Sequence, residues 1–151
     1  MAEKVNLAEK LALFDEHWQP RIVARFNDDD VRIVKVKGEF VWHRHDDTDD
    51  FFLVLKGHLT IQLRDRDVEL DEGEMFVVPR GVEHCPRADE EASVLLIEPA
   101  GTVNTGDAGA AHRGAAADLA AAEQRPVEER GHAPVVLAPV RREAARVRRG
   151  G

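Results

Sequence analysis

Two stretches of the sequence decide the fold: residues 38–45 read GEFVWHRH, and residues 73–84 read GEMFVVPRGVEH. In the first stretch, His43 and His45 stand one residue apart in a strand-like run, so their side chains point to the same face. In the second, His84 follows a Pro-x-Gly turn at the end of another β-rich run. Neutral imidazoles gathered in this way inside a β-barrel are ligands for a transition metal. The sequence therefore predicts a metal site.

Short apolar or alternating runs surround these stretches, with turns rich in Gly, Pro and Asp between them. The strands that they predict are residues 31–37, 51–55, 59–63, 68–70, 75–78 and 94–97. Many short, regularly spaced strands are typical of an all-β sandwich or closed barrel. Ahead of them, Leu7, Leu11 and Phe14 have helical spacing, which predicts a short N-terminal helix with Asn6 as its cap.

With these elements in place, the sequence resembles a small single-domain cupin of the cupin-2 conserved-barrel type. The matching motif positions are His43, His45 and Gly57 in residues 38–57, then Gly73, Pro79, Gly81 and His84 in residues 73–84. Three positions depart from the family pattern: Gly38 precedes His43 by four residues instead of five, Asp50 replaces a Glu, and Ala88 replaces an Asn. The resemblance covers roughly residues 30–100 and implies a double-stranded β-helix, that is, a jelly-roll barrel.

The resemblance also implies a ligand set. It brings together His43, His45, Asp50 and His84 around one divalent transition metal, whether Fe, Mn, Ni, Co or Zn. Asp50 stands where the family usually has Glu, and it shares strand parity with Phe52 and Val54. Aspartate is one methylene shorter than glutamate, so direct ligation, a water-bridged contact and a three-histidine site all stay open. The four aspartates of residues 46–50 are also typical of a solvated turn.

Composition limits the class of protein. Residues 1–107 hold 13 Lys and Arg against 24 Asp and Glu, and an acidic body argues against nucleic-acid binding. Cys85 is the only cysteine, which excludes an intrachain disulfide and favours a reducing compartment. No run of about twenty apolar residues could span a bilayer, and the amino terminus lacks the order of a signal peptide. We expect a cytoplasmic protein with no membrane partner.

The chain divides at Asp107 in composition. Residues 1–107 are expected to form the cupin domain, and residues 108–151 an Ala/Arg-rich tail. Nine of residues 108–122 are alanine, and the tail carries 8 Arg against 5 acidic residues. Such a segment buries too little apolar surface to offset the entropy of ordering it. The tail is therefore expected to be flexible and loosely ordered.

Several residues near the motifs have simpler interpretations. Cys85 alternates with His84 and is expected to be a small buried residue on the other face. Alternation also places Phe40 and Trp42 opposite the histidines, where they would pack between sheets or across a subunit interface. Family analogy implies a two-fold homodimer. Residues 98–107 have turn composition and could cover one mouth of the barrel.

Two functions follow from a metal site in such a barrel. The first is an enzyme of dioxygenase, isomerase or lyase type that acts on a small polar metabolite, with the metal polarising a carbonyl or activating oxygen. The alternative is a non-catalytic module that binds a small molecule, because the fold alone does not fix the function. The sequence assigns no catalytic side chain.

Overall fold

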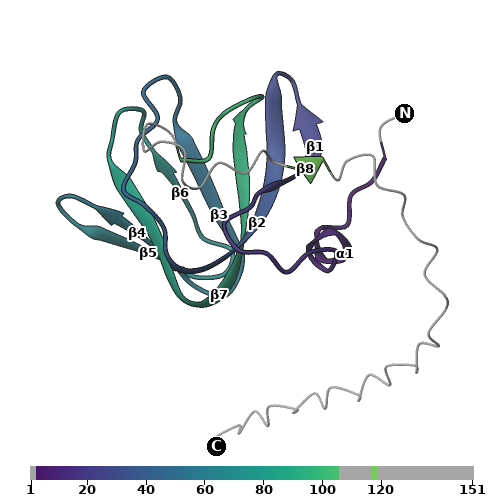
Figure 1. Ribbon diagram of the computed structural model, residues 1–151, viewed down its shortest axis with the longest axis horizontal. Helices are drawn as coiled ribbons and strands as arrows, with labels where there is room; N and C mark the ends of the chain where they lie inside the picture. Colours follow the sequence, from purple (N-terminus) through teal and green to yellow (C-terminus); the bar gives the residue numbers. More distant parts are fainter. Residues whose placement is uncertain (1–2, 106–116, 119–151) are drawn as a thin grey trace, which may run out of the picture.

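The computed structural model describes residues 3–105 and 117–118; residues 1–2, 106–116 and 119–151 lie outside this description. The described chain forms one short helix and eight strands (Figure 1). Their bounds are α1 Leu7–Leu11, β1 Arg21–Phe26, β2 Asp29–Glu39, β3 Asp50–Lys56, β4 Leu59–Leu63, β5 Asp67–Leu70, β6 Met75–Val78, β7 His84–Pro99 and β8 Ala117–Asp118.

Strand β7 connects the two halves of the sheet. Its residues 84–87 pair with β4, and residues 93–97 pair with β2 on one side and β3 on the other. The strand order is β5-β4-β7-β2-β1-β8, with β6 next to β3. All pairs are antiparallel except that of β1 with β8. Because one long strand belongs to both halves, the sheet curls into a jelly-roll barrel, and the predicted all-β fold class is confirmed.

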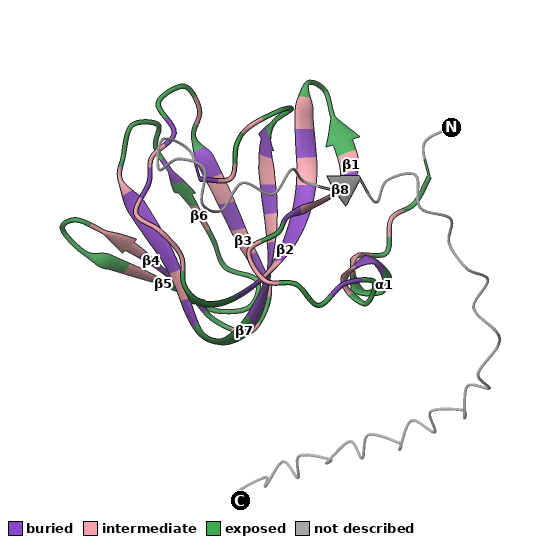
Figure 2. Cartoon of the chain, viewed as in Figure 1, coloured by how far each residue is buried: buried purple, intermediate pink, exposed green. Residues whose placement is uncertain are grey.

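Alternation along the strands gives the barrel its interior, and Figure 2 shows the buried stretches along β2, β3 and β7. On β3, Asp50, Phe52 and Val54 are buried, whereas Phe51 and Leu53 are half-buried. The predicted parity of Asp50 is therefore confirmed. The interior is filled mainly by Val34, Val36, Phe52, Val54, Leu59, Ile61, Val94 and Leu96. The histidine motifs open onto this same apolar interior.

The N-terminal helix covers part of the outer surface of the barrel. The Asn6 side chain caps α1 by accepting hydrogen bonds from the backbone N–H groups of Ala8 and Glu9, at 3.1 and 3.2 Å. Phe14, which follows the helix, packs against Val23 of β1 and Ile33 of β2. Leu7 and Leu11 of the helix pack against the same cluster. Both the predicted helix and its predicted cap are confirmed.

Two features of the strands were not predicted. Strand β1 lacks alternation because its register shifts between Ile22 and Ala24, so Ile22 and Val23 are both buried. Strand β7 begins at His84 rather than at residue 94. Pro86 and the exposed acidic residues 89–91 hide its first half from a search for alternating apolar residues.

The predicted tail lies outside the described residues except at β8, where Ala117 and Asp118 pair in parallel with Arg21 and Ile22 of β1. The division of the chain at Asp107 therefore stays a prediction. No helix within the described ranges combines the length and the apolar character needed to cross a membrane.

Two glycines with left-handed backbone allow a matched test of the packing. Gly57 has φ +85°, and a Cβ there would lie 3.0 Å from the Glu91 carbonyl oxygen; Gly73 has φ +80° and open space around it. Gly73→Ala should lower the free energy of unfolding by about 1–2 kcal/mol, the cost of the backbone conformation. Gly57→Ala should cost about 1–3 kcal/mol more, because the Cβ also meets fixed backbone. Urea unfolding measures both, and equal losses would contradict the close packing at Gly57.

Candidate metal centre

Backbone pairing brings the two histidine motifs together. The His43 N–H donates to the His84 carbonyl at 3.0 Å, and the His84 N–H donates to the His43 carbonyl at 2.9 Å. Two residues further along, the Gly81 N–H donates to the His45 carbonyl at 2.8 Å. The rings of His43 and His84 consequently lie next to each other, with centroids 4.3 Å apart.

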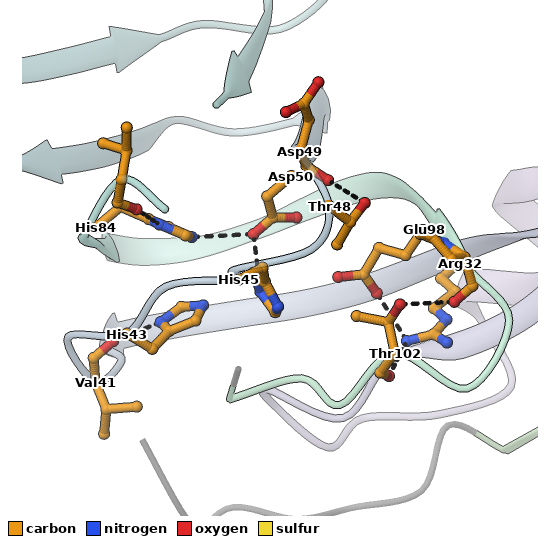
Figure 3. Close-up of polar contacts among 12 residues, drawn as sticks. Arg32, Val41, His43, His45, Thr48, Asp49, Asp50, His84, Glu98 and Thr102 are labelled. Carbon is orange, nitrogen blue, oxygen red and sulfur yellow. Dashed lines mark hydrogen bonds and ion pairs between the residues drawn. The ribbon is translucent and has the colours of Figure 1, made fainter. Parts of the chain in front are cut away.

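The four predicted ligands form one buried cluster (Figure 3). His43, His45, Asp50 and His84 are each at most 7% exposed, and each offers one ligand atom within 4.8 Å of the others. Asp50 Oδ2 lies 3.0 Å from His84 Nε2 and 3.4 Å from His45 Nε2. The shorter aspartate side chain thus reaches the imidazoles, although the sequence left its reach open.

Hydrogen bonds orient two of the rings. Nδ1 of His43 lies 2.9 Å from the Val41 carbonyl, and Nδ1 of His84 lies 3.0 Å from the Val82 carbonyl. A carbonyl oxygen can only accept, so we assign the proton to Nδ1 in both rings. The lone pair on Nε2 then points away from the backbone and toward the cluster, which is the usual arrangement of metal-binding histidines.

The protonation states also suit a cation. Burial, followed by the charge of His84, lowers the pKa of His43 to about 4, so this ring is neutral at pH 7. Burial raises the pKa of Asp50, but its close contacts with the imidazoles of His45 and His84 outweigh burial, and the pKa falls to about 2. A neutral imidazole and an ionised carboxylate are the ligand forms that metal ions need.

The donor set fits a divalent transition metal. With the proton on Nδ1, the contact between His84 Nε2 and Asp50 Oδ2 joins two hydrogen-bond acceptors, which a shared cation would satisfy. Asp50 Oδ1 is buried, and no donor among the described residues bonds to it. Three imidazoles and one carboxylate are ligands for Fe, Mn, Co, Ni or Zn. The cluster can therefore hold a metal ion of this kind.

The cluster borders two spaces. The inner cavity is lined by His43, Asp50, apolar residues of β2, β3 and β7, and Glu98, and it leaves about 40 Å³ for the centres of water molecules. The outer hollow, lined by His45, residues 44–48, Thr102 and Val103, leaves about 320 Å³. A ligand bound at the cluster can therefore extend into either space.

A second buried polar group, which the sequence analysis missed, lies beside the cluster. Arg32 Nη1 donates to Glu98 Oε2 at 2.7 Å and to the Thr102 carbonyl at 3.1 Å, and Nη2 donates to Asp30 Oδ2 at 3.2 Å. Burial, followed by the charge of Asp50, raises the pKa of Glu98 to about 7. The signal was present in the sequence, because Glu98 has the inward parity of Val94 and Leu96.

Comparisons with known proteins agree with this geometry. The family model described as "Cupin domain" matches residues 31–98. A cupin-2 domain containing protein from Shewanella frigidimarina has a solved structure with 50% identity and a TM-score of 0.62, covering 63% of this chain and 93% of that one. Uncharacterized protein YdbB of Bacillus subtilis is 32% identical over 77 residues, which cover 50% of this chain and 68% of YdbB.

The chain belongs to the cupin family. The cupin is also similar to a 3-hydroxyanthranilate 3,4-dioxygenase of Brucella anthropi, at 33% identity over 84 residues. That alignment covers 50% of this chain and 46% of the dioxygenase, so the matched region spans less than half of the relative.

Two aromatic residues beside the histidines, Phe40 and Trp42, have different surroundings. The prediction that Phe40 faces away from the histidines is wrong: its ring meets the edge of His43 at 5.5 Å and stacks on Trp18 at 4.7 Å. Strand β2 ends at Glu39, so alternation no longer applies to Phe40. Trp42 packs instead beneath Arg64, whose guanidinium lies 3.7 Å from the ring centroid.

Two further interpretations agree with the structure. Cys85 is fully buried and free, and its pKa rises to about 11 because burial disfavours the thiolate. Of residues 98–107, which were predicted to cover one mouth of the barrel, residues 100–105 do lie over it, since Asn104 lines the inner cavity and Thr102 the outer hollow. Glu98 and Pro99 instead end β7, and residues 106–107 lie outside the described residues.

Removing two of the clustered imidazoles tests the site. The double variant His43→Ala/His45→Ala should lose stoichiometric metal, because one imidazole and one carboxylate remain. Metal content after purification without chelator is measured by mass spectrometry. His58→Ala is the matched control: His58 is exposed, bonds to Glu69 and Asp71, and lies outside the cluster, so its metal content should stay unchanged. If the double variant kept the metal content of the wild-type protein, the assignment of these residues as metal ligands would be wrong.

Proposed function

We propose that this cupin is a metal-dependent enzyme of the dioxygenase type that acts on a small molecule, with His43, His45, Asp50 and His84 as the metal ligands. The observation that carries the proposal is the buried cluster of three imidazoles and one carboxylate beside an apolar cavity. When bound, a divalent transition metal supplies Lewis-acid polarisation of a ligand oxygen and, for a redox-active ion, activation of oxygen.

The chain's own residues bind and shield the reacting molecule. The carbonyls of Val41 and Val82 hold the His43 and His84 rings with Nε2 toward the cluster. Phe52 and Leu96, both lining the inner cavity, exclude water from one side. Entry is through the outer hollow, which His45 also lines. A ligand with two adjacent oxygen or nitrogen donors suits such a centre, because it can occupy two positions on the metal.

The similar proteins favour a dioxygenase over an isomerase or a lyase. Four curated relatives, at 33–39% identity over the aligned residues, are named 3-hydroxyanthranilate 3,4-dioxygenase. Their name describes a benzoate that carries adjacent amino and hydroxyl groups. The alternative is a non-catalytic cupin module that binds a small molecule, and isomerase or lyase chemistry would need the same metal site without oxygen.

Oxygen uptake tests the proposal. The full chain is loaded with Fe²⁺ without oxygen and is then mixed in air-saturated buffer with catechol, 2-aminophenol or 3-hydroxyanthranilate. At least one compound should consume oxygen in a 1:1 ratio to substrate lost. The His43→Ala/His45→Ala variant should be inactive, and His58→Ala should be fully active. Binding of these compounds without oxygen uptake or product would instead support the non-catalytic module.

We also propose that the cupin forms a homodimer through an apolar face of the sheet. The register aligns two rows of outward side chains across β7, β3 and β6. These rows are Ile97, Phe51 and Val77, and Leu95, Leu53 and Met75. Met75 is 52% exposed and Val77 39%. Among the described strands, β6 pairs only with β3, so its free edge can pair with the same edge of a second copy.

Sedimentation of the purified full chain measures the assembly. The wild-type chain should have the mass of a dimer, and Met75→Lys should shift it to a monomer because the charge would be buried without a partner. Phe26→Lys is the control, since Phe26 is 64% exposed on β1 outside this face. A monomeric wild-type protein at micromolar concentration, or a dimeric Met75→Lys variant, would argue against this interface.

We further propose that residues 1–107 form the cupin domain, that residues 108–151 form a tail, and that the protein works in the cytoplasm. The pairing of Ala117 and Asp118 with β1 supports contact of the tail with the sheet at that one place. The single buried, free Cys85 supports a reducing compartment.

A further inference from the structure

A carboxylate outside the ligand cluster faces the same space. Glu98 is 3% exposed, lines the inner cavity together with His43 and Asp50, and extends from β7 toward the His45 and Asp50 side of the barrel (Figure 3). The roles proposed above for the metal ligands do not use this group.

Arg32 fixes the orientation of Glu98. The guanidinium bonds to Oε2, while its other contacts are to Asp30 and the Thr102 carbonyl. Glu98 Oε1 is therefore the oxygen that a ligand can reach. Arg32 is itself buried, and its guanidinium forms ion pairs with Asp30 and Glu98.

The inner cavity offers acceptors and lacks a cationic side chain. No Lys or Arg is among the described residues that line it. Its other polar side chain near Glu98 is Asn104, whose Nδ2 donates to the Trp18 carbonyl at 3.2 Å and whose oxygen is thereby left as an acceptor. A buried carboxylate with few donors is costly unless a ligand donates to it.

We propose that Glu98 selects the substrate of this cupin by accepting a hydrogen bond from a hydroxyl, amine or ammonium group on the part of the ligand that enters the inner cavity. The inference rests on the proposed function, since it assumes that the ligand binds the metal cluster at its other end. The ligand is then neutral or cationic at this end. A carboxylate there would meet Glu98 in a cavity that no described Lys or Arg lines, so the preferred substrate differs in charge from 3-hydroxyanthranilate.

The size of the cavity limits this part of the ligand. About 40 Å³ for water centres corresponds to roughly three water molecules. A substituent of two or three heavy atoms fits, while an aromatic ring with metal-binding groups would lie at the cluster and in the outer hollow. Three catechols of equal ring size meet this condition: 3,4-dihydroxybenzylamine, 3,4-dihydroxybenzyl alcohol and 3,4-dihydroxybenzoate.

Calorimetric titration of the Co²⁺-loaded full chain with these probes, at pH 8 and without oxygen, tests the proposal. The wild-type protein should bind the amine at least about tenfold more tightly than the carboxylate, with the alcohol between them. Glu98→Gln keeps an oxygen for Arg32 but presents an NH₂ to the cavity. This variant should reduce the ratio to about threefold or less, whereas Glu91→Gln, on an exposed position of β7, should leave it unchanged.

Each outcome decides the proposal. A wild-type preference for the carboxylate, equal affinities, or an unchanged ratio in Glu98→Gln would overturn it, even if that variant is less stable to heat. Should Glu98→Gln fail to fold, the order of the three probes on the wild-type protein decides alone. Binding of catechol but of none of the three substituted probes would also overturn it. Failure of catechol itself to bind would count against the proposed function instead.

Discussion

The reciprocal backbone hydrogen bonds between His43 and His84 are the constraint on which the site depends. His43 lies in an irregular segment after β2, and this pairing, together with the bond from the Phe40 N–H to the Pro86 carbonyl at 2.9 Å, fixes it beside the first residue of β7. The bond from Gly81 to the His45 carbonyl extends the pairing along the same segment. Since both ring nitrogens Nδ1 are held by local carbonyls, the backbone sets the ring positions before any metal binds.

Charge balance inside the barrel relates the cluster to its neighbours. Among the residues that the structure describes, Asp30, Asp50 and Glu98 are buried, and Arg32 supplies the one buried guanidinium. Buried charges are costly unless they are compensated. Asp30 pairs with Arg25 and Arg32, and Glu98 pairs with Arg32. Asp50 instead contacts the imidazoles of His45 and His84, where a bound cation would balance its charge. Burial and the nearby charge of Asp50 also raise the pKa of Glu98 to about 7.

Much of the fold and the cluster could be predicted because both depend on local periodicity. The parity of Asp50 follows from strand geometry. His43 and His45 lie beyond the end of β2, and the backbone bridge between His43 and His84 brings this segment to the cluster. Phe40 was misplaced because the strand ends one residue before it, and no local pattern marks that end. Glu98 and Arg32 were not predicted to be buried, because a charged residue in an apolar strand is expected to be exposed unless its partner on the neighbouring strand is known. Their pairing depends on the register of β2 with β7, which the sequence does not state.

The length of β7 has a consequence for the dynamics of the protein. This strand carries His84 at one end and Glu98 near the other, and between them it forms ladder bonds with three other strands. Local opening that releases His84 must break bonds in the same strand that supports the core. His84 therefore belongs to the cooperative unit that includes the core strand, and its amide should exchange with solvent more slowly than the amides of the loop that carries His45. Ligand entry then depends on the loop after Pro99 rather than on breathing of the sheet.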